Sequence, residues 1–191
     1  MSKDCVSPAL NRVLLLPGWC NSDAAHWQSR WESRYGYERV QQHDWQWPLR
    51  GDWTVRLQEV VSESDHPVLL VAHSLGCILV AWWAAHSPLA STKVCGALLV
   101  APGDVERENL SNALIGWKPV PFKRLPFPCV LVGSRDDPYC HFERAQMFAQ
   151  AWGAQFVDAG YAGHINTASN LGDWNEGHQQ LQRLMLKTEN G

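Results

Sequence analysis

Residues 67–86 read PVLLVAHSLGCILVAWWAAH, and this stretch decides the fold. Its first part, Pro67–His73, is a continuous apolar run, which is typical of a short strand buried on both faces of a sheet. Ser74 follows directly, and the small and apolar residues of Leu75–His86 then favour a helix. The stretch therefore predicts a buried strand that turns into a helix, with a serine at the turn.

Apolar runs and helix-like segments alternate along the rest of the chain. Since 191 residues match the usual length of one domain, about 100–200 residues, we expect a single domain over residues 1–191. The alternation predicts an α/β fold, with a mostly parallel sheet of about six strands and helices on both faces. Strands are expected at Val13–Pro17, Tyr37–Gln42, Pro67–His73, Val94–Ala101, Cys129–Gly133 and Gln155–Val157. Helices are expected at Ala24–Tyr35, Asp52–Ser64 (with Asp52 as N-cap), Leu75–His86, His141–Trp152 and Asp173–Leu186.

The composition excludes several classes of protein. Hydrophobic residues make up 46% of the chain and charged residues 18%, which is typical of a globular protein. The net charge is −3 and no run of Lys or Arg exceeds two residues, so we expect no nucleic-acid partner. No apolar stretch approaches the roughly 20 residues that span a bilayer, so we expect no membrane partner either.

The cysteines and the N-terminus bear on the compartment. The six cysteines form no Cys-x-x-Cys pair, and residues 1–8 contain no apolar run of the kind found in export signals. We therefore expect reduced thiols and a cytoplasmic location.

Ser74 is the expected nucleophile. The motif Ala72-His73-Ser74-Leu75-Gly76 resembles the Gly-x-Ser-x-Gly elbow, in which a sharp turn between strand and helix lifts the serine hydroxyl above the sheet. Small residues are needed on both sides because backbone and helix approach closely there; Gly76 is one, and Ala72 replaces the other glycine. The alternative is an ordinary turn whose serine caps the helix.

His164 is the expected base. A serine hydroxyl needs a base and a carboxylate that orients it, and in α/β-hydrolases these follow in the order Ser, Asp or Glu, His. This order excludes the histidines before Ser74, and His86, His141 and His178 fall on predicted helices. Only His164 follows a late strand in a loop, where Gly160 and Gly163 allow the chain to bend back. A surface histidine without a catalytic role is the alternative.

The carboxylate is expected after the strand Cys129–Gly133. Asp136 and Asp137 both follow this strand, and their position does not separate them. Asp104, after the preceding strand, is a third and more distant option. One aspartate of the pair could instead cap the next helix.

Two backbone amides are expected to form an oxyanion hole. In this fold one N–H comes from the residue after the nucleophile, here Leu75, and the other from an early strand–helix loop. Trp19 is the candidate in that loop, because Gly18 gives its amide the freedom to turn toward the site.

Aromatic residues and a long connection are the candidates for a substrate pocket. The chain has 11 tryptophans, and Trp19, Trp45, Trp47 and Trp117 fall in segments that could approach the strand ends. We expect Trp45, Trp47 and Trp117 to form a pocket wall, with packing in the core as the alternative. Residues 103–128 contain prolines at 119, 121, 126 and 128, and a connection of this length is expected to form a minimal lid.

No metal and no cofactor are expected. The eight histidines include no His-Glu-x-x-His motif or clustered ligand spacing. Neither Gly-x-Gly-x-x-Gly nor a P-loop follows any predicted strand, so a nucleotide is not expected.

With these residues in place, the chain resembles the retinoblastoma-binding-protein-nine-like serine hydrolases, particularly the bacterial members. The resemblance covers nearly the whole chain, from Pro17-Gly18 and His26-Trp27 through Asp44-Trp45, Pro48, Trp53 and the Ala72–Gly76 elbow to Gly133-Ser134-Arg135-Asp136-Asp137-Pro138 and Gly163-His164. It implies a compact α/β-hydrolase without a large cap, and Asp137 rather than Asp136 as the acid. The Leu-x-Cys-x-Glu motif of the mammalian relative is not present, so no pocket-protein partner is implied.

Together the residues and the resemblance predict a metal-free serine hydrolase with the triad Ser74, His164 and Asp137. The expected substrates are small or short-chain carboxylic esters, because no large cap is expected. A binding protein on a hydrolase scaffold is one alternative. A thioesterase or acyltransferase with the same triad is another.

Overall fold

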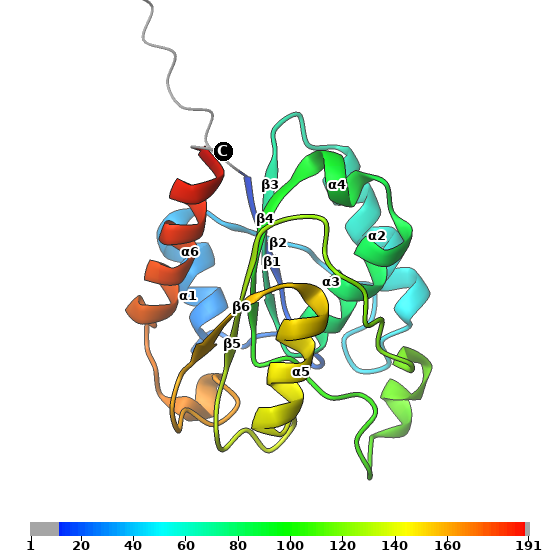
Figure 1. Ribbon diagram of the computed structural model, residues 1–191, viewed down its shortest axis with the longest axis vertical. Helices are drawn as coiled ribbons and strands as arrows, with labels where there is room; N and C mark the ends of the chain where they lie inside the picture. The colour runs from blue at the N-terminus through cyan, green and yellow to red at the C-terminus, as the bar shows by residue number, and fades with distance from the viewer. Residues whose placement is uncertain (1–11, 190–191) are drawn as a thin grey trace, which may run out of the picture.

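The chain folds around a parallel sheet with the strand order β2-β1-β3-β4-β5-β6 in the computed structural model, which describes residues 12–189 (Figure 1). The strands are β1 (Arg12–Leu16), β2 (Glu38–Arg39), β3 (Val68–His73), β4 (Val94–Val100), β5 (Cys129–Gly133) and β6 (Gln155–Asp158). The chain runs from β1 outward to β2 and then returns to β3, on the other side of β1. The direction of winding therefore reverses between β1 and β3, where α/β folds of this type bind ligands beyond the carboxyl ends of the strands.

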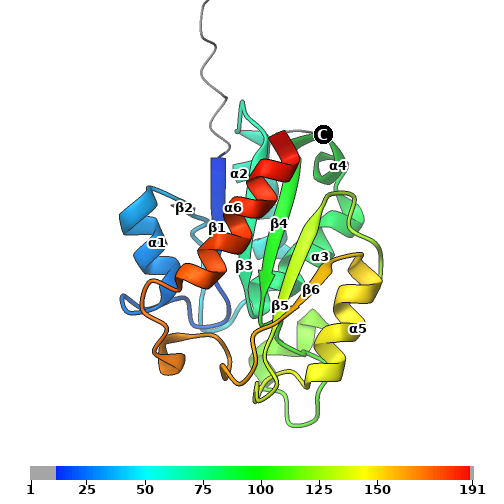
Figure 2. The ribbon, with the colours of Figure 1, turned by 60° about the vertical axis from the view of Figure 1, so that its left-hand side comes forward.

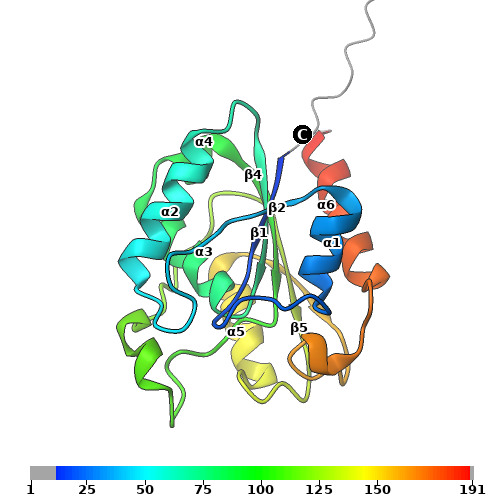
Figure 3. The ribbon, with the colours of Figure 1, turned by 180° about the vertical axis from the view of Figure 1, so that it is seen from behind.

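Helices cover both faces of the sheet. One face carries α1 (Trp27–Tyr35) and α6 (Asn175–Glu189), and α6 lies across β4 (Figure 2). The other face carries α2 (Arg50–Ser62), α3 (Leu75–His86), α4 (Leu89–Lys93) and α5 (Phe142–Trp152), as the reverse view also shows (Figure 3).

The apolar run of β3 explains why it lies in the interior of the sheet. Successive side chains of a strand point to opposite faces. Leu70 and Ala72 join the cluster under α2 and α3, whereas Leu69 and Val71 join the cluster under α1 and α6. All four are fully buried, so both faces of β3 contribute to the core.

The α/β fold predicted from the sequence is confirmed. Each predicted strand and helix is present, with ends that differ by a few residues. The prediction that Asp52 is the N-cap of its helix is wrong, because α2 begins at Arg50 after the N-cap Leu49. Asp52 lies in the first turn of α2, where the positive end of the helix dipole stabilises a carboxylate. The short helix α4 and the 3-10 helices η1 (Asn112–Trp117) and η2 (Thr167–Ser169) were not predicted, because they are too short for a periodic pattern.

The connection of residues 103–128 packs against the face of α2 and α3. Val105, Val120, Leu125 and Phe127 are buried in that core cluster, together with Trp117 from η1. Apolar side chains of the connection thus anchor it on both sides of η1.

Two expectations from the sequence concern the state of the cysteines and the absence of a membrane-spanning segment. The cysteines at 20, 77, 95, 129 and 140 are all free thiols, while Cys5 and the stretch of residues 1–8 lie outside the described residues. Within residues 12–189, no helix combines the length and the apolar character needed to cross a bilayer.

Candidate active site

Ser74 lies at the turn between β3 and α3 with backbone angles of φ 53° and ψ −119°. A left-handed φ is unusual for a residue with a side chain and is found where the surrounding structure enforces it. Here the surroundings are tight: a Cβ on Gly76 would lie 2.2 Å from the carbonyl oxygen of Leu16, and a Cβ on Gly18 would lie 2.7 Å from the Cβ of Ser74. Gly76 therefore lets α3 approach the end of β1, and Gly18 lets the loop after β1 approach the serine.

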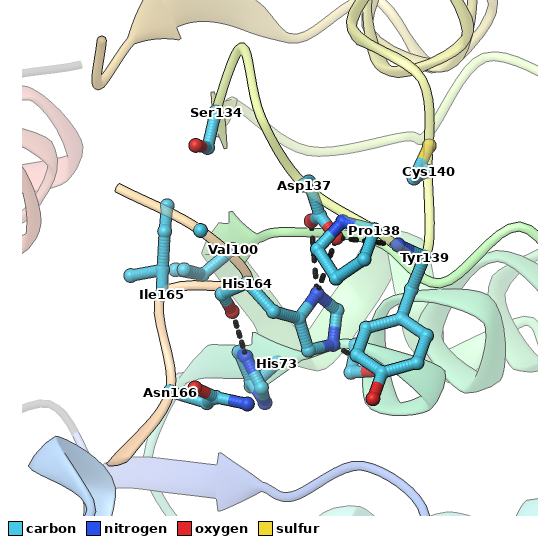
Figure 4. A network of polar contacts seen from close by, with 12 residues as sticks. His73, Val100, Ser134, Asp137, Pro138, Tyr139, Cys140, His164, Ile165 and Asn166 are labelled. Atoms are coloured by element: carbon cyan, nitrogen blue, oxygen red, sulfur yellow. Dashed lines mark hydrogen bonds and ion pairs between the residues drawn. The ribbon is translucent and has the colours of Figure 1, made fainter. Parts of the chain in front are cut away.

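The imidazole of His164 lies within hydrogen-bond reach of this serine, and the carboxylate of Asp137 lies within reach of the imidazole. His164 Nε2 is 2.9 Å from Ser74 Oγ, and His164 Nδ1 is 2.9 and 2.8 Å from the two carboxylate oxygens of Asp137. Asp137 Oδ1 also accepts the backbone N–H of Tyr139 at 2.8 Å. Figure 4 shows Asp137 above the imidazole and the ring of Tyr139 beside it, with the ring centres of Tyr139 and His164 4.6 Å apart.

This arrangement fixes how the imidazole is oriented. The side chains of His164 and Asp137 are only 7% and 3% exposed, so water competes little for their hydrogen bond. A carboxylate can only accept, so Nδ1 carries the proton and the lone pair of Nε2 faces the serine hydroxyl. That tautomer is the one that a base beside a nucleophilic serine needs.

The other two candidate carboxylates lie apart from the imidazole. Asp136 accepts the hydroxyl of Ser134 and the N–H of Gly163, both at 2.8 Å, and the N–H of Gly163 lowers the pKa of Asp136 the most. Asp104 forms an ion pair with Arg144. Of the three aspartates considered from the sequence, the structure brings only Asp137 to His164.

The two residues whose amides are expected to form an oxyanion hole both lie near Ser74: Leu75 follows it in the chain, and Trp19 lines the same cavity. Leu75 is the first residue of α3, so its N–H has no acceptor within the helix. The N–H of Trp19 has no acceptor among residues 12–189. Gly103 faces the same space, since a Cβ there would lie 3.3 Å from Ser74 Oγ and 3.7 Å from the Leu75 nitrogen.

A cavity of about 340 Å³ opens above Ser74. Its apolar and aromatic lining comes from the loop after β1, the start of α3, the 103–128 connection and the loop after β5: Trp19, Leu75, Val105, Leu110, Leu114 and Tyr139. Its polar lining comes from His26, His73, the loop that follows His164 and the charged residues Asp23, Asp104 and Arg107. Leu110 and Leu114 show that the 103–128 connection forms one wall of the cavity.

The aromatic wall expected from Trp45, Trp47 and Trp117 is not the wall of this cavity. Trp117 is fully buried and donates its indole N–H to the carbonyl of Pro48 at 2.9 Å. Trp45 packs edge to face against Trp53, and Trp47 is 64% exposed. Tryptophan is large enough to reach either a core or a pocket, and the direction in which each side chain points cannot be read from the sequence pattern.

Two further histidines next to the site were not identified as site residues from the sequence. The rings of His26, His73 and His164 follow one another with centre-to-centre distances of 4.8 Å. Burial lowers the pKa of His26 to about 4, and burial also places the pKa of His73 well below its ordinary value. Both rings are therefore neutral near pH 7. The only sequence signal was their position, directly before α1 and directly before Ser74.

The lowered pKa of His26 makes folding stability depend on pH. The unfolded chain binds this proton with a pKa of about 6.5 and the folded chain only near 4, so the unfolded state is favoured as pH falls through this range. The contribution of His26 to the free energy of unfolding should fall by about 2 kcal/mol between pH 7 and pH 5.

Denaturant melts of His26→Asn at both pH values would check this. Asparagine can still cap α1 as His26 does, by accepting the N–H of Gln28, but it does not titrate. The variant should therefore lose about 2 kcal/mol less than the wild type on acidification. Equal losses in the two proteins would contradict the assignment to His26.

A metal site needs several ligating side chains grouped together. Within residues 12–189, no three His, Cys, Asp or Glu side chains are grouped in a way that could ligate an ion.

Comparison with known proteins shows the family to which the chain belongs. The model of the family described as serine hydrolase matches residues 13–183 of the chain. Comparison with curated proteins gave no significant match.

Solved structures resemble the chain over nearly its whole length. A protein described as a YdeN-like hydrolase, from Pectobacterium atrosepticum, is 30% identical with a TM-score of 0.82, and the match covers 93% of this chain and 91% of that one. The ydeN gene product of B. subtilis is 18% identical with a TM-score of 0.72, covering 92% and 98%. Est1E from Butyrivibrio proteoclasticus, solved with ferulic acid bound, is 10% identical with a TM-score of 0.69, covering 94% and 92%. At identities of 18% and 10%, the ydeN gene product and Est1E show only that this chain shares their fold.

Proposed function

Because the chain belongs to the serine hydrolase family, we propose that it cleaves small or short-chain carboxylic esters through an acyl-enzyme formed on Ser74. The observation that carries the proposal is the chain of contacts from Ser74 Oγ through His164 to Asp137, at the base of a cavity. Such a chain turns a weakly nucleophilic hydroxyl into a reactive one.

In the proposed reaction Ser74 Oγ attacks the carbonyl carbon of the ester while His164 Nε2 takes the hydroxyl proton. The tetrahedral intermediate then expels the alcohol, which leaves with the proton from His164. Water attacks the resulting acyl-enzyme, again with His164 as base, and the carboxylic acid is released. Asp137 keeps the imidazole in its reactive tautomer and stabilises the imidazolium that forms in each step.

The negative charge of the tetrahedral oxygen needs hydrogen-bond donors in fixed positions. The N–H groups of Trp19 and Leu75 are the proposed donors, because both residues line the same cavity as Ser74 and neither N–H is bonded to an acceptor among residues 12–189. Donors of this kind typically contribute about 10²- to 10³-fold to the rate.

The cavity supports a small ester with an apolar part. Its volume of about 340 Å³ is near the lower end of the range for small-molecule sites, and Trp19, Leu110 and Leu114 offer an apolar surface to an alkyl or aryl group. Est1E, an enzyme of the same fold, has been solved with ferulic acid, an aromatic acid, bound. We further propose that the chain belongs to the retinoblastoma-binding-protein-nine-like group of its family, because it carries the motifs that this resemblance rests on.

Labelling with a fluorophosphonate and hydrolysis of p-nitrophenyl esters test the proposal together. We expect covalent labelling of one serine, with kcat/KM highest for the acetyl to butyryl esters and lower for longer acyl chains. Absence of both labelling and turnover across ester and thioester panels would overturn the proposal in favour of a binding protein. Added alcohols or amines test the acyltransferase alternative: faster p-nitrophenol release with an acylated acceptor as product would support it.

A further inference from the structure

We propose that Asp136 and His73 are positioning residues, which hold the backbone on either side of the His164 side chain and thereby set the distance from its imidazole to Ser74. This inference rests on the proposed function, since it assigns these residues to the reaction that the triad would carry out. Neither residue takes part in proton transfer.

The segment that carries His164 has no regular structure to hold it in place. It lies between β6 and η2, and Gly163 and Ile165 both have left-handed backbone angles, with φ of 56° and 48°. A base must nevertheless be held to within a fraction of an ångström of its nucleophile for efficient proton transfer. Hydrogen bonds from other segments must therefore fix this loop.

Asp136 fixes the N-terminal side of His164. Its Oδ1 accepts the N–H of Gly163 at 2.8 Å and the hydroxyl of Ser134 at 2.8 Å. Ser134 is 1% exposed, and its Oγ also accepts the N–H of Ala162 at 2.9 Å. We call the segment between β6 and η2, residues 159–166, the base loop. Two consecutive amides of the base loop are thus bound by one connected pair of side chains from the loop after β5.

His73 fixes the C-terminal side of the same residue. Its Nε2 donates to the carbonyl oxygen of His164 at 2.9 Å, as the dashed line between the two residues in Figure 4 shows. A carbonyl can only accept, so Nε2 of His73 carries the proton. His73 is 5% exposed and sits directly before Ser74, so a single short segment carries both the nucleophile and a support for its base.

The next residues of the loop are held in the same way. The indole N–H of Trp27 donates to the carbonyl of Ile165 at 2.8 Å, and Thr167 donates to the carboxylate of Asp23. These bonds come from α1 and the loop before it, on the face opposite to α5. The base loop is therefore held from both ends, and Asp136 and His73 contact the backbone nearest to the imidazole.

The adjacent aspartates thus have different roles. Asp137 contacts the imidazole of His164, whereas Asp136 contacts the backbone that precedes it. The contact of Asp136 needs an acceptor oxygen, which an amide also offers. The contact of Asp137 needs a full negative charge opposite the imidazolium.

This difference gives a sharp test in which the same substitution is made at both positions. Asp136→Ala removes the acceptor and should lower kcat and the fluorophosphonate labelling rate by about 10- to 100-fold, with KM changing little. Asp136→Asn keeps the acceptor and should recover most of this loss, to within about threefold of the wild type. At His73, glutamine presents an N–H at a similar reach and should recover more activity than His73→Leu.

Controls separate positioning from stability. Asp173→Ala removes another surface carboxylate that joins two segments, through Arg30 and Arg34 on α1, but its side chain does not contact the base loop. We expect it to change the melting temperature without changing the labelling rate. If Asp136→Ala does not fold, Ser134→Ala removes one member of the same pair and should lower the labelling rate in the same direction.

The outcomes are distinct. The inference is overturned if Asp136→Ala is labelled at the wild-type rate, or if Ser134→Ala is, where Asp136→Ala does not fold. It is also overturned if Asp136→Asn loses as much kcat as Asp137→Asn. In either case a labelled wild type leaves the proposed function standing. A wild type that neither labels nor turns over esters overturns the proposed function, and this inference with it.

Discussion

Replacement of Ser74 by alanine is expected to lower kcat for ester hydrolysis by about 10⁶-fold and to abolish fluorophosphonate labelling. The variant loses the atom that forms the acyl-enzyme, so only the hydrogen-bond donors and the binding site remain to assist attack by water. The purified variant should fold, because alanine occupies the same space as serine without its hydroxyl.

The measurement needs a control for contaminating esterases, since the residual rate is small. Mass spectrometry of the labelled wild-type protein should locate the adduct on the peptide that contains Ser74. Unchanged turnover in Ser74→Ala, or an adduct on another residue of the wild type, would refute the assignment of Ser74 as nucleophile.

Replacement of Asp137 by asparagine is expected to lower kcat by about 10⁴-fold while leaving KM nearly unchanged. An amide can donate to Nδ1 of His164, which favours the tautomer with the proton on Nε2, so that the base has no lone pair for the serine hydroxyl. The side chain is nearly isosteric with aspartate, and the N–H of Tyr139 can still be accepted by its oxygen.

Asp136→Asn is the internal comparison for this result, because the substitution is identical and the residues are neighbours. A loss at position 136 that exceeds the loss at position 137 would mean that the acid is Asp136. Equal and small losses at both positions would mean that His164 needs no carboxylate or is not the base. Kinetics at several pH values would show whether Asp137→Asn recovers activity as pH rises.

Much of the fold followed from the sequence because each element has its own signal. The apolar runs of β1, β3, β4 and β5 are long enough to identify strands buried on both faces, and the structure confirms them. The weaker strands and the 3-10 helices have short or mixed patterns, so their ends were less accurate or they were missed. The N-cap of α2 was misassigned because Asp52, a common capping residue, lies in the first turn.

The residues of the candidate site could be predicted from the sequence only in part. Ser74 and His164 stood out because one lies in a recognisable strand–turn–helix motif and the other in a glycine-containing loop after a late strand. Asp136 and Asp137 could not be separated from spacing, and the resemblance alone pointed to Asp137. His73 was set aside as a base because it precedes Ser74, and its contact with the His164 carbonyl has no signature in the sequence.

The sequence by itself determined the order of strands and helices, the sharp turn at Ser74 and the set of side chains that could carry acyl transfer chemistry. These depend on local hydrophobic pattern and on residue type, which can be read along the chain. Only the tertiary structure decided which aspartate meets the imidazole, which loop bonds hold that imidazole, and that Trp19 rather than Trp117 lines the cavity. Those contacts depend on the direction in which each side chain leaves its loop, and that direction is set by segments distant in sequence that pack against one another.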